Sequence, residues 1–307
     1  MPELPDIVVY IEALESRVLN RTLEGIRIVS PFVLRSVEPA PSALVGRKVR
    51  AIRRLGKQIV LGFEGQYFLV VHLMITGRLQ WREPRAPAAG KIALAAFDFE
   101  SGTLLLTEAG SKKRASLHVV QGIESLEAFN RHALEVLDCE LTAFDAALRR
   151  ENHTLKRSLT DPRLFSGIGN AFSDEILHHA RLSPLKLTAK LLDEEVRRLW
   201  ESARAVLSEW SVRLRRQTGS EFPSKVTAFR PEMAVHGRYG KPCPRCGAPV
   251  QRIVYAENEC NYCAPCQTEG RLLADRAISR LLKEDWPRSI EEMEKHIASR
   301  IKGRTPN

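Results

Sequence analysis

The sequence lacks a long hydrophobic run and has few aromatic residues. Its longest apolar stretch, Tyr67–Ile75, has nine residues and is interrupted by His72, whereas a membrane-spanning helix needs about 20 apolar residues. Pro2, Glu3 and Asp6 fall where a signal peptide would have its apolar core. Aromatic residues make up 7% of the chain and do not cluster, which argues against an RNA-binding protein that stacks single-stranded bases. We therefore expect a soluble intracellular protein.

The composition indicates several folded domains and a polyanionic partner. With 44% hydrophobic and 27% charged residues, the 307-residue chain is too apolar to be disordered and long enough for two or three domains. The net charge of +10 favours nucleic acid as a partner first and an anionic membrane second. Solubility alone would also explain a basic protein. The charge is concentrated, however, because Trp210–Ala256 alone carries +7.

Five of the six cysteines lie between Cys243 and Cys266. Such a density in an intracellular chain is more typical of a metal site than of disulfides. Two Cys-X-X-Cys pairs separated by sixteen residues are typical of a zinc ribbon, in which four thiolates leave no open position for catalysis. Cys260 with Cys263 is an alternative second pair. A proline inside each of the preferred pairs favours one structural zinc ion held by Cys243, Cys246, Cys263 and Cys266.

The apolar pattern changes from strand-like to helical along the chain. A first amphipathic helix is predicted from the spacing of Ile7, Ile11, Leu14 and Val18. Short runs separated by turns then predict a β-sandwich or barrel, with strands at Lys57–Phe63, Tyr67–His72, Leu94–Phe99 and Thr103–Thr107. Later segments predict a hairpin within Val250–Tyr262 and helices at Ala143–Arg150, Ala171–Ala180, Asp193–Leu214, Leu272–Leu282 and Ser289–Ile301.

Four features in a fixed order give the chain a family resemblance. They are the start Met-Pro-Glu-Leu-Pro-Asp, the run Leu164–Asn170 (Leu-Phe-Ser-Gly-Ile-Gly-Asn) leading into Asp174-Glu-Ile-Leu177, the run Val235–Cys243 (Val-His-Gly-Arg-Tyr-Gly-Lys-Pro-Cys), and the cysteine ribbon. Together they span positions 2 to 266. The sequence resembles the formamidopyrimidine-DNA glycosylase / endonuclease VIII family, as a divergent member.

The resemblance implies an α+β multidomain fold with DNA between its halves. It predicts an N-terminal β-sandwich domain with an N-terminal helix at residues 1–125 and a helix–two-turn–helix domain at residues 126–235. A four-cysteine zinc ribbon at residues 236–270 and a helical extension at residues 271–307 follow. The order strands, helices, ribbon agrees with the order of the periodic segments.

The resemblance assigns the chemistry to the N-terminal residues. Removal of Met1 is expected to expose the secondary amine of Pro2, and an N-terminal amine has an ordinary pKa of ~7.7–8.0, so a useful fraction is neutral and nucleophilic. Family members attack the sugar C1′ with this amine, expel the oxidised base and cleave the strand by β- and δ-elimination. Glu3 is the expected acid or base. Alternatively, the segment is an ordinary turn in which Asp6 caps a helix.

The resemblance also implies contacts with DNA. It places Lys57 in the catalytic centre as a phosphate-binding lysine and makes His72 a second phosphate contact. In the helical half, it predicts that Lys156 lies near the lesion, that Asn170 binds phosphate at a helix N-terminus, and that Glu175 is a polar or structural partner on the same helix. A solvated lysine, a structural histidine and an ordinary helix cap are the simpler interpretations of Lys57, His72 and Asn170.

Three departures from the family pattern concern the residues that grip or read DNA. Asn258 stands where the family has a finger arginine. Either Met74 or Ile75 would be the apolar wedge that enters the base stack. The loop Gly110–Ala115 keeps cations, Lys112, Lys113 and Arg114, but has no aromatic residue to stack opposite the orphaned base.

These observations predict a DNA glycosylase with abasic-site lyase activity. Its partner would be duplex DNA with oxidised bases, with 8-oxoguanine and formamidopyrimidine favoured by the start Pro-Glu-Leu-Pro, or with abasic sites. A monomer in the cytoplasm, at the nucleoid of a bacterial-type cell, is expected. The alternative is a zinc-containing module that binds damaged DNA and has lost excision, which the altered loop and Asn258 would favour.

Overall fold

The computed structural model describes residues 1–223, 226–255, 258–273 and 289–292. The chain forms two compact units, and each draws on two segments of sequence. The first unit comprises Met1–Glu135 with Leu207–Ala228, and the second comprises Val136–Val206 with Phe229–Asn307. The predicted boundaries at residues 125, 235 and 270 stay predictions, since this division follows packing rather than motifs.

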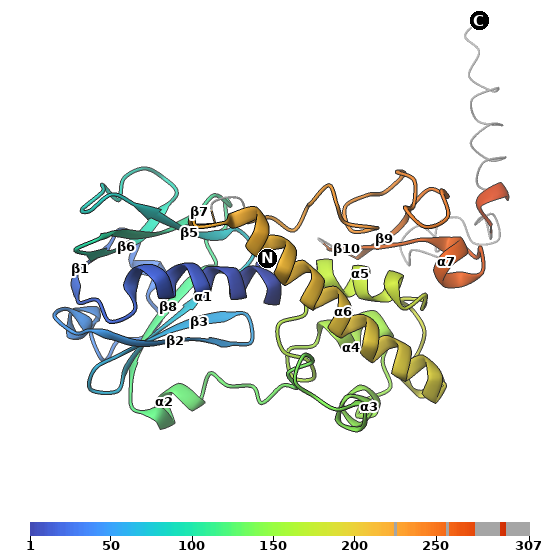
Figure 1. Ribbon diagram of the computed structural model, residues 1–307, viewed down its shortest axis with the longest axis horizontal. Helices are drawn as coiled ribbons and strands as arrows, with labels where there is room; N and C mark the ends of the chain where they lie inside the picture. The colour runs from blue at the N-terminus through green and yellow to red at the C-terminus, as the bar shows by residue number, and fades with distance from the viewer. Residues whose placement is uncertain (224–225, 256–257, 274–288, 293–307) are drawn as a thin grey trace, which may run out of the picture. The chain divides into compact units, whose positions relative to one another are not determined.

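The first unit is a sandwich of two antiparallel four-stranded sheets (Figure 1). One sheet has the order β1-β6-β7-β5 and the other the order β2-β3-β4-β8. The strands are β1 (Leu23–Ile28), β2 (Val49–Leu55), β3 (Gln58–Phe63), β4 (Tyr67–His72), β5 (Gly77–Arg82), β6 (Ala93–Phe99), β7 (Gly102–Glu108) and β8 (Ser116–Gln121). The four strands predicted between residues 57 and 107 are thus confirmed within one or two residues.

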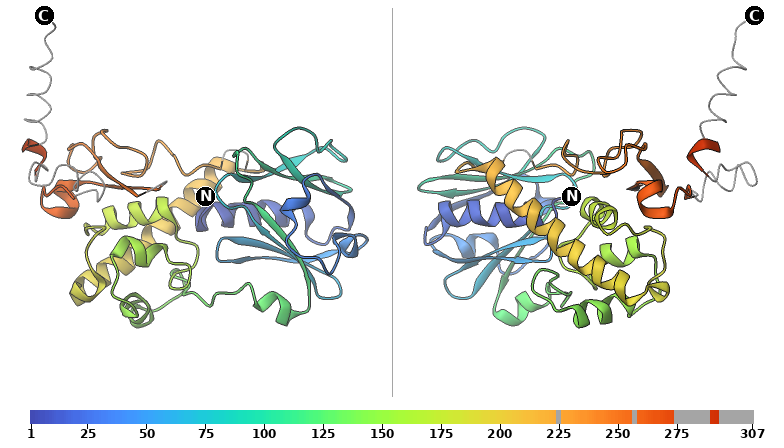
Figure 2. Two further views of the ribbon diagram at one scale, coloured as in Figure 1. Left: turned by 180° about the vertical axis from the view of Figure 1, so that it is seen from behind. Right: turned by 45° about the vertical axis from the view of Figure 1, so that its right-hand side comes forward.

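Burial explains why these runs form strands. β6 and β7 are buried along their whole length, and β3 and β4 nearly so. The side chains on the inner faces of these strands form one core with residues of α1 (Leu4–Val18), which lies between the two sheets in Figures 1 and 2. On the other face of β3 and β4, Val60, Phe68 and Val70 form a separate cluster with Leu126. The predicted spacing on α1 accordingly corresponds to Ile7, Leu14 and Val18, all fully buried.

The start of α1 differs from the simple helix-cap interpretation. The N-cap is Glu3, not Asp6. Asp6 is the third helical residue, and its carboxylate accepts the backbone N–H of Glu3 at 3.0 Å while the Glu3 side chain accepts the backbone N–H of Asp6. This reciprocal capping box satisfies two otherwise unpaired donors and fixes Pro2 directly before the helix.

The second unit is built from helices followed by a ribbon. Its main helices are α3 (Leu141–Arg149), α4 (Leu155–Thr160), α5 (Asn170–His179) and α6 (Asp193–Thr218), and the C-terminal part of α6 belongs to the first unit. The predicted helices at 143–150, 171–180 and 193–214 are confirmed with small shifts of their ends. A short 3-10 helix, η3 (Thr188–Lys190), also belongs to this unit, whereas the short helices η1 (Pro31–Val33), η2 (Pro41–Leu44) and α2 (Ile123–Glu127) belong to the first unit.

The ribbon consists of the antiparallel strands β9 (Gln251–Tyr255) and β10 (Asn258–Tyr262), followed by α7 (Ala264–Thr268). The predicted hairpin is therefore present. The predicted closing helices at 272–282 and 289–301 lie mostly outside the described residues. Among the described helices, none is both long and apolar enough to cross a membrane.

Candidate functional site

The N-terminal segment is buried among charged groups. Pro2 is buried and Glu3 is only 2% exposed. Burial lowers the pKa of the terminal amine of Met1. The carboxylate of Glu3 opposes this shift, and the cations of Arg78 and Lys57 reinforce it. Removal of Met1 would make the buried Pro2 nitrogen the terminal amine, and burial favours the neutral form that a nucleophile requires.

Lys57 lies near the terminal amine of Met1 and near His72. It follows Gly56, whose φ of 61° suits the two-residue turn between β2 and β3. Its cation lowers the pKa of the terminal amine and also that of His72. His72 ends β4, where it pairs with Gln58 and Ser116. Burial first, then Lys57, lowers the pKa of His72 to about 4, so its imidazole is neutral at physiological pH.

The two wedge candidates, Met74 and Ile75, lie in the turn after His72 and differ in backbone conformation and exposure. Met74 has a φ of 53°, a left-handed conformation that favours glycine. Ile75 is 47% exposed, although it is large and apolar. Arg78 donates to the carbonyl oxygens of Ile75 at 3.2 Å and Gly77 at 2.7 Å. Ile75 is therefore the exposed residue of a turn whose backbone is held by hydrogen bonds from Arg78.

The loop Gly110–Ala115 is organised by a residue that the sequence analysis missed. Glu108, at the end of β7, is 1% exposed. One of its carboxylate oxygens accepts the backbone N–H groups of Arg114 at 2.8 Å and Ala115 at 3.1 Å. Lys113 donates to the backbone carbonyl oxygen of Glu108, whereas Lys112 and Arg114 are exposed.

The second unit brings Lys156 and Asn170 together at the start of α5. Gly169 is the N-cap and Asn170 is the first helical residue, so Asn170 is not the cap itself. The Nζ of Lys156 donates to the carbonyl oxygen of Asn170 at 2.6 Å and to the carboxylate of Asp174 at 2.6 Å. The Asn170 amide donates to the carbonyl oxygen of Glu259 on β10 at 2.9 Å. The turn is thereby fastened to the ribbon hairpin beside it (Figure 1).

Two adjacent carboxylates of α5 join the helix to the ribbon. Asp174 is fully buried and accepts from His236 Nδ1 at 2.7 Å and from the backbone N–H of Asn261 at 3.1 Å, in addition to Lys156. Glu175 is 5% exposed and accepts three backbone N–H groups, those of Ala234, Val235 and His236. Both carboxylates are used internally, which fits the structural role considered for Glu175.

Four cysteine sulfur atoms converge as a metal-binding set. The Sγ atoms of Cys243, Cys246, Cys263 and Cys266 all lie within 4.8 Å of one another. The pairs Cys246–Cys263 and Cys243–Cys266 are 3.4 Å and 4.0 Å apart. A tetrahedral zinc ion with Zn–S bonds of about 2.3 Å needs sulfur atoms roughly 3.8 Å apart. The donors thus fit a four-thiolate metal site, and Cys260 is not part of the set.

A histidine that the sequence analysis missed contacts this set. His178, on α5, is 4% exposed, and its Nε2 lies 3.2 Å from Cys243 Sγ. Burial, assisted by Arg245, lowers the pKa of His178 to about 4. With its proton on Nε2, the neutral imidazole would donate to the Cys243 thiolate of a bound metal ion. Such outer contacts orient a ligand and lower its effective charge.

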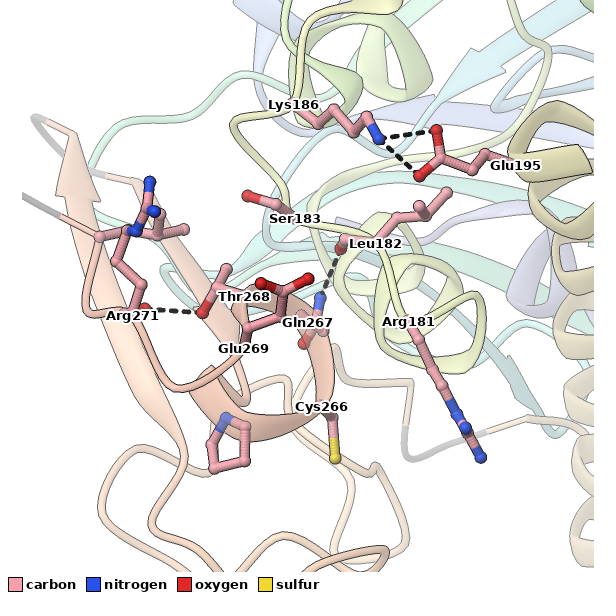
Figure 3. Close-up of a pocket in the computed structure, with 12 residues that line it drawn as sticks. Arg181, Leu182, Ser183, Lys186, Glu195, Cys266, Gln267, Thr268, Glu269 and Arg271 are labelled. Carbon is pink, nitrogen blue, oxygen red and sulfur yellow. Dashed lines mark hydrogen bonds and ion pairs between the residues drawn. The ribbon is translucent and has the colours of Figure 1, made fainter. Parts of the chain in front are cut away.

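A pocket of about 420 Å³ lies beside α7, and several of its polar side chains are paired within the protein (Figure 3). Lys186 is neutralised by Glu195, whose carboxylate oxygens lie 2.5 and 2.6 Å from its Nζ. The Gln267 amide donates to the carbonyl oxygen of Leu182 at 2.9 Å and links α7 to the loop that follows α5. The lining includes none of the residues around the N-terminus, such as Pro2, Glu3 and Lys57.

Sequence comparison agrees with this arrangement. The models of the formamidopyrimidine-DNA glycosylase N-terminal domain and H2TH domain match residues 1–110 and 133–222. The formamidopyrimidine-DNA glycosylase of Thermus thermophilus is 34% identical, over 88% of this chain and 100% of its own. That of Chloroflexus aurantiacus is 31% identical, over 87% and 98%. The chain belongs to the formamidopyrimidine-DNA glycosylase family.

Solved structures of this family share the fold. The MutM (Fpg) protein of Thermus thermophilus has a TM-score of 0.71 at 30% identity, covering 87% of this chain and 98% of its own. Lactococcus lactis Fpg, solved with DNA containing an abasic site, has a TM-score of 0.76 at 24% identity, covering 87% and 99%, a likeness of fold. The expected β-sandwich, helix–two-turn–helix domain and cysteine ribbon are confirmed.

Residues outside the family motifs carry much of the geometry. Arg78, Glu108 and His178 organise the wedge turn, the basic loop and the metal site, and the sequence analysis singled out none of them. Arg78 and Glu108 lie within strand-like runs, where a charged residue is ordinarily interpreted as solvated. Only their hydrogen bonds in the folded chain distinguish them.

Proposed function

We propose that this member of the formamidopyrimidine-DNA glycosylase family excises oxidised bases from duplex DNA and cleaves the resulting abasic strand. The observation that carries the proposal is the burial of Pro2 and Glu3 beside Lys57 and Arg78, in a unit that matches the family's N-terminal domain. A protein that only binds DNA needs no nucleophile there.

The proposed reaction begins once Met1 has been removed. The neutral Pro2 nitrogen attacks C1′ of the damaged nucleotide, the C1′–N glycosidic bond breaks, and the base leaves with the bonding electrons and takes up a proton. Loss of the nitrogen's proton and opening of the sugar ring leave an iminium. The iminium acidifies the C2′–H, so a base removes that proton and the C3′–O bond breaks. A second elimination then breaks the C5′–O bond.

Glu3 is proposed as the acid and base of these steps. Its carboxyl is 2% exposed and adjoins Pro2 in sequence, so it is placed to protonate the opening sugar ring and later to accept a proton. The capping box holds it at the start of α1. Lys57 is proposed to hold the phosphate next to the reacting sugar while lowering the pKa of the amine.

Each unit is proposed to supply its own DNA contacts. In the first unit these are His72, Lys112, Lys113 and Arg114. In the second they are Lys156 and the Asn170 turn, where backbone N–H groups at the start of α5 suit a phosphate. Glu175 is proposed to act through the turn rather than on DNA. Because Ile75 is the exposed residue of its turn, we assign it as the wedge in preference to Met74.

The four-cysteine set is proposed to hold zinc as a structural ion. Four thiolates complete the tetrahedron, so the ion stabilises the ribbon and takes no part in bond breaking. The favoured lesions are 8-oxoguanine and formamidopyrimidine. In support, structures of Lactococcus lactis Fpg were solved with abasic-site DNA and with Fapy-dG DNA. A monomer acting in the cytoplasm, at the nucleoid, is proposed.

The test is borohydride trapping on a duplex with one abasic site. The purified protein, with Met1 removal verified by mass, should form a covalent protein–DNA adduct, because borohydride reduces the iminium. Pro2→Gly should lose strand cleavage while keeping the metal content and the folded spectrum. Lys190→Ala, an exposed lysine on η3, serves as a matched control and should behave as wild type.

The same experiment separates the alternative function. A module that binds damaged DNA without excision would retain the duplex but give no adduct. The absence of an aromatic residue in Gly110–Ala115 is the observation that favours this alternative. Unimpaired cleavage by Pro2→Gly would remove Pro2 from the mechanism.

A further inference from the structure

Two loops of the first unit meet at one buried carboxylate. The wedge loop, Leu73–Gly77, carries Ile75, and the basic loop, Gly110–Ala115, carries three cations. Glu108 lies between them, with 1% of its surface exposed. Its Oε1 accepts the hydroxyl of Thr76 at 3.0 Å, and its Oε2 accepts the backbone N–H groups of Arg114 and Ala115. One side chain thus bonds to both loops.

Close packing reinforces this connection. A Cβ on Gly110 would lie 2.5 Å from the Thr76 hydroxyl oxygen, and a Cβ on Gly77 would lie 2.2 Å from the carbonyl oxygen of Leu73. Neither glycine has a positive φ that would require it on conformational grounds. Both glycines are therefore explained by close approach. The approach at Gly77 lies within the wedge loop, and the approach of Gly110 to Thr76 packs the two loops directly against each other.

Backbone pairing and the hydrogen bonds of Arg78 also hold the wedge loop in place next to Glu108. Glu108 pairs with Gly77 in the β5–β7 register. Arg78 bonds to the carbonyl oxygens of Ile75 and Gly77, and its Nε donates to that of Val226 at 2.6 Å. A displacement of the basic loop cannot leave the wedge loop in place unless the bonds to Glu108 break.

We propose that Glu108 is a positioning residue that couples the wedge loop to the basic loop, so that entry of Ile75 into the base stack and engagement of Lys112–Arg114 with DNA occur as one step. This inference rests on the proposed function of the chain as a DNA glycosylase. Glu108 acts through the two loops and not on the reacting atoms. The coupling depends on the arrangement of the hydrogen bonds that Glu108 makes, and not on its charge or on proton transfer.

The chemistry of the carboxylate suggests informative variants. In Glu108→Gln, the amide oxygen can still accept both backbone N–H groups, and the amide N–H₂ can donate to the Thr76 hydroxyl oxygen. Glu108→Ala removes all three bonds. Thr76→Val keeps the shape of residue 76 and removes only the hydroxyl, so it breaks the bond to the wedge loop alone. Thermal unfolding verifies that each variant is folded.

The first experiment measures two single-turnover rates on each variant: excision of 8-oxoguanine paired with cytosine, and borohydride trapping on an abasic duplex. Thr76→Val and Glu108→Ala should slow excision by about tenfold or more, because misplacing a positioned group by an ångström has effects of that size. Trapping should fall much less, since no base must be expelled from the stack. Glu108→Gln should stay within about threefold of wild type for both rates.

The second experiment is a double-mutant cycle between Ile75→Ala and Lys112→Ala. Their effects on excision should be non-additive when Glu108 is present and additive in the Glu108→Ala background, because residues that share a structural element couple and independent ones do not. Additive effects with Glu108 present would overturn the proposal. So would a strong loss in Glu108→Gln, which would indicate a charge or proton role instead.

The outcomes distinguish this inference from the proposed function. If the wild-type protein neither excises the lesion nor forms the trapped adduct, the proposed function fails. If the wild type does both and Thr76→Val and Glu108→Ala match it, the function stands and the coupling role of Glu108 is wrong.

Discussion

Replacing Glu175 should destabilise the second unit more than any surface change. Its carboxylate accepts the backbone N–H groups of Ala234 at 2.7 Å, Val235 at 2.9 Å and His236 at 2.9 Å. Glu175→Leu has a similar volume but leaves all three donors without an acceptor. Each buried donor left unpaired costs about 1–3 kcal/mol. Even the lower value gives a loss of about 3 kcal/mol in the free energy of unfolding.

The expected shift can be measured by thermal unfolding. In a unit of about 150 residues, 1 kcal/mol moves Tm by about 2–4 °C, so Glu175→Leu should lower it by about 6–12 °C. Glu175→Gln keeps the oxygen that serves two donors and turns its N–H₂ toward the third. It should therefore lose about 1–3 kcal/mol.

The control is Glu201→Leu, which removes the same charge from an exposed position on α6. It should change stability by no more than about 0.5 kcal/mol. Metal content is measured in parallel, so that loss of a metal ion is not mistaken for loss of the three hydrogen bonds to Glu175. A Tm for Glu175→Leu within about 2 °C of the wild type would refute the reasoning.

Three further outcomes are expected. The trapping rate should fall about tenfold per pH unit below a midpoint under 8.0, because the Pro2 amine must be neutral to attack and it lies next to Met1, whose amine has a pKa lowered by burial; a midpoint at or above 8.0 would contradict this. His178→Phe should release zinc to a chelating dye about 10–100-fold more readily, with the exposed His179→Phe as control; equal release would show that the contact with Cys243 is unimportant. Duplex affinity should fall with salt, and Lys112→Ala should reduce the slope of log K against log salt by about 1; an unchanged slope would place Lys112 off the phosphates.

The elements themselves were predictable because their signals are local. Strand-like runs bounded by turns indicated β3, β4, β6 and β7 to within one or two residues. The cysteine spacing indicated the four cysteines whose sulfur atoms converge, since two tight turns are enough to aim four thiolates at one point. The nucleophile candidate, Pro2, likewise followed from a short motif at the start of the chain.

The contacts that organise the site were not predictable because they join residues far apart in sequence. Glu108 differs from a solvated glutamate only through its bonds to Thr76, Arg114 and Ala115. The choice between Met74 and Ile75 depended on backbone conformation and exposure.

The sequence by itself therefore determined the family, the order of strands, helices and ribbon, and the residue types available for chemistry. Those depend on periodicity and spacing along the chain. Only the tertiary structure decided which charged groups are buried, and hence the lowered pKa of the Met1 amine and of His72. It also decided that Glu175 clamps a loop instead of facing solvent. Desolvation and hydrogen-bond partners are properties of the packed chain, because both arise from residues that only folding brings together.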